Sequence, residues 1–407
     1  QFQVARVGGE YNPNMLESQA YSLYRLNYEE KVSLPISDDE LDESKNQEQD
    51  VLAVALANRM TELYADTDFG PMEKILLPPL DEKIPVQKVL YGNNWKENWK
   101  IGWKERWAAG WVEKKEQSEA VSEASMFSAP IGLLDSLATH TQPPLHIDFL
   151  KQGGHAMIVG APQTGKTFFL ETLCYSLVNN YSPSQLNMYV LSFAGRGLDA
   201  LQGLPHVGSV IEGTETEKFQ RLLRHLENEI DARKGAFSEA GVKDLTEYNL
   251  SEGVSGLPYI IVMIDNFGEL RNMEYDDEQL AINKILKSGR EYGIHFVITA
   301  LQGSDIPYKT SNLIQQRLAL DLTDRSEYVL LIGRMSMTDF DSLPAGRCFV
   351  KMTPPQICQI GLPVGKDTWS LLSPEMTSHA GESKAVAMEE LSTDISLLEL
   401  LELESEG

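Results

Sequence analysis

A glycine-rich run that ends in lysine and threonine carries the clearest chemical signal in the sequence. It fits the pattern G-x-x-x-x-G-K-[ST] and consists of Gly160, Ala161, Pro162, Gln163, Thr164, Gly165, Lys166 and Thr167, followed by Phe168. Glycine allows backbone N–H groups to turn inward around phosphate oxygens, and a following helix adds the positive end of its dipole. Lys166 would contact the β- and γ-phosphates, and the hydroxyl of Thr167 would coordinate Mg²⁺. The run predicts a binding site for ATP with Mg²⁺ at residues 160–168.

An aspartate at the end of an apolar run completes the predicted metal site. Asp265 follows Ile260–Ile264, the position of a Walker B aspartate, so we expect it to hold Mg²⁺ together with Thr167. The next residue is Asn266, where motor-type P-loop ATPases generally have a glutamate that activates water. Because an amide cannot accept a proton from water at neutral pH, we expect tight nucleotide binding with slow or absent hydrolysis. Glu269, three residues on, is either a substitute base or a structural acid.

Strands and helices alternate from residue 155 onward. Apolar runs typical of buried parallel strands lie at 155–159, 188–193, 259–264 and 296–299, with further strands expected at 318–322 and 348–352. Amphipathic helices are expected after the glycine-rich loop, at 219–230 and at 280–286. The alternation predicts the α/β class, a RecA-like P-loop NTPase with a mostly parallel sheet flanked by helices.

Composition and charge restrict the possible partners. The chain has 407 residues, of which 42% are apolar and 23% charged, as in a globular protein. Sixty acidic residues against 35 basic ones give a net charge of −25, so nucleic acid is not an expected partner. The three cysteines have no metal-binding spacing and suit reduced thiols. The chain starts at Gln1, which suggests a fragment of a longer protein.

The rest of the chain suggests a division into four parts. Alternation at Phe2–Val7 predicts a strand, the last of a preceding unit, and apolar spacing from Val51 to Met60 predicts a helix. We expect the end of a preceding module at 1–35, a connecting region at 36–130, the ATPase domain at 131–366 and an acidic tail at 367–407. Within the tail, the leucine-rich stretch Ile395–Leu403 is either a partner-binding helix or disordered.

Five of the six tryptophans recur at every fourth position, interleaved with lysines and one arginine; they are Trp95, Trp99, Trp103, Trp107 and Trp111. On a helix, this spacing forms a slowly drifting stripe, and on a strand it places all five rings on one face. The stripe fits a surface for a partner or for a membrane interface, where tryptophan and lysine are common. It equally fits a segment that packs onto its own module.

Further short stretches carry a more specific pattern than the P-loop alone; they are Ile131–Asp135, Gly195–Leu198, Leu204–Gly208, Gly289–His295 and Leu343–Arg347. In combination with the P-loop they resemble the FtsK/SpoIIIE-type ATPases, and more closely the type VII secretion ATPases of the EccC/EssC/YukB family. The resemblance runs from Phe2 to about Val364, and the tryptophan stretch looks like an insertion. Ser192-Phe193-Ala194 departs from the pattern, because many members have an acidic residue there.

The resemblance carries expectations about function. Members string several ATPase modules along one membrane-anchored chain, so it implies a terminal module at the cytoplasmic face of the membrane, anchored through segments outside this sequence. It also implies WXG/ESX-type substrates recognised through their C-terminal signals, contacts with the other modules of the longer chain, and a possible homo-hexamer. By alignment, Thr299 is similar to the polar sensor near the γ-phosphate, and Arg317 to an arginine offered in trans. A DNA-translocating motor of the FtsK/SpoIIIE type is the alternative.

Overall fold

A computed structural model of the chain describes residues 24–26, 31–33 and 78–389, apart from 122–123, 137–138, 152, 252–255, 273–275 and 335–341. The chain divides into two compact units, residues 1–75 and 76–407. In the first unit, strands β1 (Tyr24–Leu26) and β2 (Lys31–Ser33) pair antiparallel. The strand predicted at 2–7, the helix predicted at 51–60 and the leucine-rich stretch at 395–403 lie outside the described residues.

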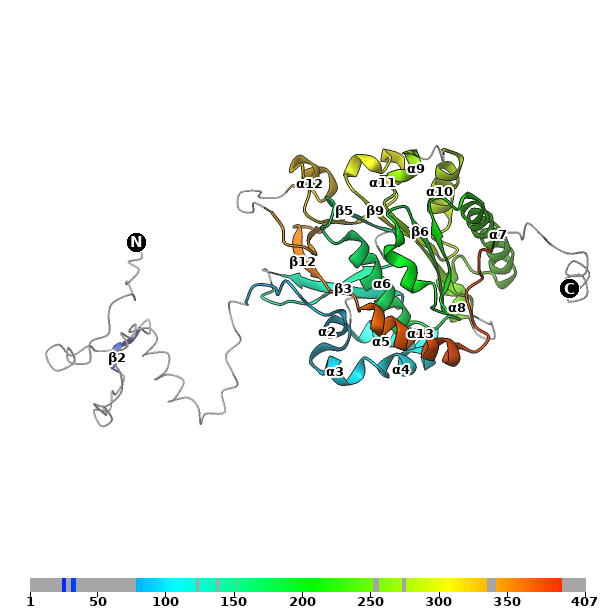
Figure 1. The fold of residues 1–407 in the computed structure, drawn as a ribbon. Coiled ribbons are helices and arrows are strands. Elements are labelled where there is room, and N and C mark those ends of the chain that lie inside the picture. The colour runs from blue at the N-terminus through cyan, green and yellow to red at the C-terminus, as the bar shows by residue number, and fades with distance from the viewer. Residues whose placement is uncertain are drawn as a thin grey trace, which may run out of the picture. The chain divides into compact units, whose positions relative to one another are not determined.

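The second unit contains one ten-stranded sheet in the order β4-β3-β12-β11-β10-β5-β9-β8-β6-β7 (Figure 1). The strands from β10 to β7 in this order pair parallel, and those from β4 to β10 pair antiparallel. The strands are β3 (Ser128–Asp135), β4 (Pro144–Asp148), β5 (Ala156–Val159), β6 (Leu186–Ser192), β7 (Val207–Glu212), β8 (Tyr259–Asp265), β9 (Ile294–Ala300), β10 (Gln316–Ala319), β11 (Arg347–Val350) and β12 (Gln356–Ile360).

Helices cover both faces of this sheet (Figure 1). They are α2 (Val86–Tyr91), α3 (Trp95–Asn98), α4 (Gly102–Ala108), α5 (Trp111–Val121), α6 (Lys166–Asn180), α7 (Thr216–Ala240), α8 (Leu245–Leu250), α9 (Glu269–Asn272), α10 (Asp276–Ser288), α11 (Tyr308–Ser311), α12 (Ser326–Leu331) and α13 (Lys366–Ala380). Short 3₁₀ turns are η2 (Gly92–Asn94), η3 (Arg196–Leu201) and η4 (Gly303–Asp305). No helix in the described part of the chain is both long and apolar enough to cross a membrane.

Alternation along the central strands builds two apolar layers. In β5, Ala156 and Ile158 face the layer that contains α6, whereas Met157 and Val159 face the layer that contains α7 and α10. Successive strand residues point to opposite faces, so a strand with helices on both sides is apolar throughout. The predicted α/β fold of the RecA-like type is confirmed, with an antiparallel part in the sheet. The strand expected at 318–322 instead spans Gln316–Ala319, and the sequence did not predict β3, β4, β7 or β12 as strands.

The tryptophan stretch packs onto the core of the second unit. It forms helices α3, α4 and α5, and Trp103, Trp107 and Trp111 are at most 8% exposed. The indole of Trp107 donates a hydrogen bond of 2.8 Å to Val178 O near the end of α6, and its ring meets the His206 ring edge-on. His206 belongs to the Leu-Pro-His-Val-Gly stretch, so this supposed insertion contacts one of the family motifs. Three of the five rings therefore belong to the core.

Truncation of Trp107 should destabilise the domain strongly. Trp107→Ala removes a buried ring and leaves Val178 O without its indole donor, so we expect a loss of about 3–5 kcal/mol in the free energy of unfolding. Trp95→Ala is the matched control, because Trp95 is only half-buried, and should cost less than about 1 kcal/mol. Urea unfolding followed by circular dichroism measures both, and equal losses would contradict this packing.

Three buried histidines make stability depend on pH. Burial lowers the pKa of His155 and of His206 to about 4, and lowers that of His295 well below its usual value. The unfolded chain binds more protons than the folded one between about pH 4 and 6.5, so stability falls as the pH falls through this range. We expect His155 and His206 each to cost roughly 2 kcal/mol between about pH 7 and pH 5. Urea unfolding across that range checks this, and a free energy of unfolding that does not fall between about pH 7 and pH 5 would contradict it.

Candidate nucleotide-binding site

The glycine-rich loop joins the end of β5 to the start of α6, at the carboxyl edge of the parallel strands. This position is the usual ligand site of an open α/β sheet. Gly165 has φ +113°, a conformation that a residue with Cβ rarely adopts, and Gln163 has φ +64°. A Cβ on Gly160 would come within 2.6 Å of Thr164 Oγ1. The loop therefore has the compact turn that a phosphate cradle requires.

Lys166 lies folded against its own loop. Its ammonium donates 2.8 Å hydrogen bonds to Gly160 O and Ala161 O. Burial lowers the pKa of Lys166, and the carboxylate of Asp265 opposes that shift. An ammonium that is desolvated and aimed at the loop is suited to bind an anion there, because a phosphate would restore the charge compensation that water no longer gives. The lysine therefore fits the role predicted for it.

A hydroxyl–carboxylate network links the loop to two neighbouring strands. Asp265 is 2% exposed at the end of β8. Its Oδ2 accepts a 3.0 Å hydrogen bond from Thr167 Oγ1, and its Oδ1 accepts one of 2.6 Å from Thr299 Oγ1. The structure thus brings together three residues that the sequence separates by up to 132 positions, Thr167, Asp265 and Thr299. Hard oxygen donors of this kind suit Mg²⁺, which Thr167 and Asp265 would hold beside the phosphates.

Asn266 occupies the next position in a left-handed backbone conformation, with φ +62°. Its N–H donates to Thr299 Oγ1 at 2.8 Å, and its Nδ2 donates to Glu269 Oε1 at 3.4 Å. Asn266 Oδ1 is buried and has no hydrogen-bond partner among the described residues. A buried acceptor without a partner is costly, so it calls for a donor such as a water or a ligand beside the loop. The side chain can orient a water but cannot remove its proton.

Sequence reasoning missed a contact between the loop and the Leu343–Arg347 stretch. Gly346 N donates a 2.9 Å hydrogen bond to Thr164 O, so this stretch supports the cradle directly. Arg347 anchors it by donating to Gln359 Oε1 at 2.7 Å and to Leu80 O at 2.8 Å. The stretch was noticed only as a family motif. The glycine placed immediately before a strand was the available signal for such a turn.

Arg317 lies away from the loop of its own chain. In the register of β10 with β5 it pairs with Met157, three residues before the loop begins. Its guanidinium donates to Ser311 O at 2.7 Å and to Ile314 O at 2.9 Å, and burial lowers its pKa. It also lines a cavity of about 570 Å³ together with Lys351. Contact between Arg317 and a neighbour's nucleotide requires a second copy or module, so this role stays a prediction.

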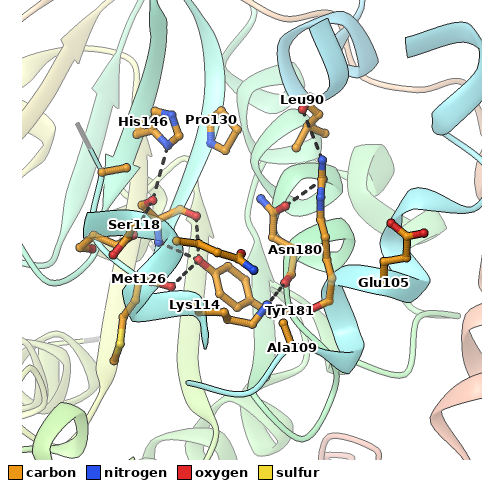
Figure 2. Close-up of a pocket in the computed structure, with 15 residues that line it drawn as sticks. Leu90, Glu105, Ala109, Lys114, Ser118, Met126, Pro130, His146, Asn180 and Tyr181 are labelled. Carbon is orange, nitrogen blue, oxygen red and sulfur yellow. Dashed lines mark hydrogen bonds between the residues drawn. The ribbon is translucent and has the colours of Figure 1, made fainter. Parts of the chain in front are cut away.

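The cavity in Figure 2 lies at the other end of α6 from the loop and has a volume of about 460 Å³. Lys114 Nζ donates to Arg106 O at 2.7 Å and to Asn180 O at 2.8 Å, and Arg106 donates to Asn180 Oδ1 at 2.9 Å. Burial, aided by Arg106, lowers the pKa of Lys114 to about 8. Carbonyls at a helix C-terminus lack partners within the helix and attract cations. These cations therefore cap the P-loop helix, and we assign them no ligand.

Comparison with known proteins finds related sequences. A profile of the FtsK/SpoIIIE family matches residues 137–319. The ESX secretion system protein EccC of Geobacillus thermodenitrificans is 31% identical over 257 residues, which cover 63% of this chain and 17% of that protein. The type VII secretion system protein EssC of Staphylococcus aureus is 23% identical over 371 residues, 90% of this chain and 23% of that protein.

Solved structures show the same similarity. ATPases 2 and 3 of EssC from Geobacillus thermodenitrificans align with a TM-score of 0.62 and 25% identity, over 80% of this chain and 57% of that one. ATPases 2 and 3 of EccC from Thermomonospora curvata, solved with a signal sequence peptide, align with a TM-score of 0.61 and 21% identity, over 79% and 57% of the two chains. At that identity the second alignment supports the fold alone.

Residues 137–319 thus match the FtsK/SpoIIIE family, and the loop, Asp265 and Thr299 lie together as the candidate nucleotide site of this part of the chain. Within that family the chain is homologous to the type VII secretion ATPases EccC and EssC, and the resemblance predicted from its motifs is confirmed. The chain spans about a fifth of the length of these curated relatives. A P-loop ATPase domain of this family implies the use of a nucleotide, usually with Mg²⁺.

Proposed function

We propose that this chain is a nucleotide-holding ATPase module of a type VII secretion system, which binds ATP with Mg²⁺ and hydrolyses it slowly or not at all. The observation that carries the proposal is Asn266 at the position of the usual base, beside the Thr167–Asp265–Thr299 network. The network supplies oxygen ligands for Mg²⁺. The Asn266 amide cannot act as a general base, and such a base typically contributes about 10²–10⁴ in rate, or roughly 3–5 kcal/mol of barrier.

Glu269 does not replace the missing base in this arrangement. It begins α9, one turn beyond Asn266, and its Oε1 accepts the 3.4 Å hydrogen bond from the Asn266 amide. A carboxylate that accepts from the amide holds the amide in place, and we propose this supporting role for Glu269. ATP would then act as a ligand that fixes the module in one conformation.

We propose further that the module recognises secreted helical-hairpin substrates of the WXG/ESX type through their C-terminal segments. The relatives are secretion ATPases, and one of them was solved with a signal sequence peptide. The module would work at the cytoplasmic face of the membrane, in contact with other ATPase modules of a longer chain or in a homo-oligomer such as a hexamer. Arg317 would then approach a neighbour's nucleotide, where a cation stabilises phosphoryl charge.

Binding to hairpin proteins with and without their C-terminal tails tests the substrate. The chain is immobilised with ATP and Mg²⁺, and surface plasmon resonance measures each hairpin protein. We expect binding that is lost when the hairpin's tail is removed. Binding that ignores the tail would contradict the recognition model. Salt-dependent binding to duplex DNA would instead support a DNA-translocating motor.

A further inference from the structure

Strand β7 forms one edge of the ten-stranded sheet, and among the strands that the structure describes it pairs with β6 alone. A free strand edge presents unpaired N–H and C=O groups and is a template for another extended segment. Two of its N–H groups are occupied by side chains, since Val210 N donates to Gln202 Oε1 at 2.6 Å and Glu212 N donates to Glu215 Oε2 at 2.8 Å. The first half of the strand is covered by a segment of backbone from later in the chain.

Residues 384–389, which follow helix α13, lie along that first half. Ala385 N donates to Pro205 O at 2.9 Å, and Met388 N donates to Ser209 Oγ at 2.8 Å. Val386 O comes so near Gly208 that any Cβ at that position would collide with it. Gly208 is thus a residue whose missing side chain makes room for another backbone.

Met388 is the anchor of this segment, which we name the tail segment (384–389). Its side chain is 7% exposed and joins the apolar layer beneath α7, together with Ile211 and Phe219. The remaining residues of the tail segment are exposed or half-buried, and Val386 is 56% exposed. One buried side chain and a few hydrogen bonds must therefore offset the conformational entropy of six ordered residues. Such a contact is weak enough to exchange.

A cavity of about 340 Å³ lies between β7 and the end of the tail segment, lined by Gln202, Val210 and Lys218 as well as by Met388. We propose that the β7 edge is a peptide-binding site that the chain's own tail segment occupies in cis. An extended segment of a partner protein displaces it, placing an unbranched apolar side chain in the Met388 position. Methionine fits such a site because its flexible thioether fills irregular apolar gaps.

This inference rests on the proposed function only in taking the occupant to be a segment of a substrate protein. The proposed nucleotide site consists of the loop and Asp265, whereas the tail segment contacts Pro205, Gly208 and Ser209. A titration with a fluorescent ATP analogue on every variant below therefore reports on the proposed function separately. Loss of peptide binding with intact nucleotide binding would refute this inference alone.

A labelled peptide of residues 382–390 tests the site directly by fluorescence anisotropy. We expect it to bind a chain that ends at Ser383, and to bind the full chain at least about tenfold more weakly, because the resident segment competes by mass action. A peptide carrying Met388→Glu should lose at least about tenfold in affinity for the shortened chain, since a charge cannot enter the apolar layer. Equal affinity for both chains, or equal affinity of both peptides, would overturn the proposal.

The full-length Met388→Glu variant provides the second test and keeps residues 384–389 in the chain. We expect it to bind the wild-type peptide as the shortened chain does, with faster exchange of the backbone amides of residues 385 and 388, which donate to Pro205 O and Ser209 Oγ in the wild type. Unchanged exchange and no peptide binding would overturn the proposal. Sedimentation of the full chain should show the same monomer fraction in wild type and Met388→Glu. A wild-type dimer that this substitution dissolves would assign the contact to exchange between copies and contradict occupation in cis.

Discussion

Asn266→Glu is expected to create steady ATP hydrolysis in a chain for which we propose slow or absent turnover. The substitution places a carboxylate next to Asp265, where a water beside the γ-phosphate would need a base, and such a base contributes about 10²–10⁴ in rate. The backbone at this position, with φ +62°, favours asparagine over glutamate, so we also expect a small loss of stability, about 1 kcal/mol. Release of inorganic phosphate under saturating ATP and Mg²⁺ measures the gain.

Two further variants make this result specific. Asn266→Glu combined with Lys166→Ala should show no gain, because the new base would have no bound nucleotide to act on. Glu269→Gln in the wild-type background should leave the low turnover unchanged, because Glu269 supports the amide and does not act as the base. If Glu269→Gln removed an existing activity, or if Asn266→Glu bound ATP without any gain in turnover, the role assigned to Asn266 would be wrong.

Lys166→Ala is expected to weaken nucleotide binding by about 10- to 100-fold, the effect of losing a charge-assisted bond to phosphate. The ammonium already points at the loop through its bonds to Gly160 O and Ala161 O, so nucleotide binding needs only a small displacement of it. Titration with a fluorescent ATP analogue measures the change. Lys151→Ala is the matched control, because Lys151 is exposed outside the loop and should leave the affinity unchanged. Full affinity in Lys166→Ala would place the nucleotide elsewhere.

Much of the candidate site could be predicted from the sequence because its signals are local. The loop pattern directly follows its own apolar strand, and Asp265 directly follows the apolar residues of β8, so each signal is contained within a few residues. Parallel strands buried on both faces also have an apolar character that needs no partner to recognise. Thr299 could be placed only by its family resemblance, and the structure shows the hydrogen bond to Asp265 Oδ1 that fixes it.

The remainder depends on contacts between distant segments. A stripe of tryptophans at every fourth position is the same pattern whether it faces a partner or its own core, and only the meeting of Trp107 with Val178 O decides between them. Strand β7 contains Gly208 and Ser209, ends at Glu212 and lies at an edge, so its apolar signal is weak. The support of the loop by Gly346 joins residues 182 positions apart. No local pattern encodes such a pairing.

The central claim is that the module holds ATP without cleaving it, and the state of the bound nucleotide tests this most directly. The chain is mixed in molar excess with radiolabelled ATP and Mg²⁺, and protein-bound nucleotide is recovered by rapid filtration and separated by chromatography. The account predicts that the bound label remains ATP in wild type and becomes ADP in Asn266→Glu. Bound ADP in wild type, formed as fast as in Asn266→Glu, would contradict it.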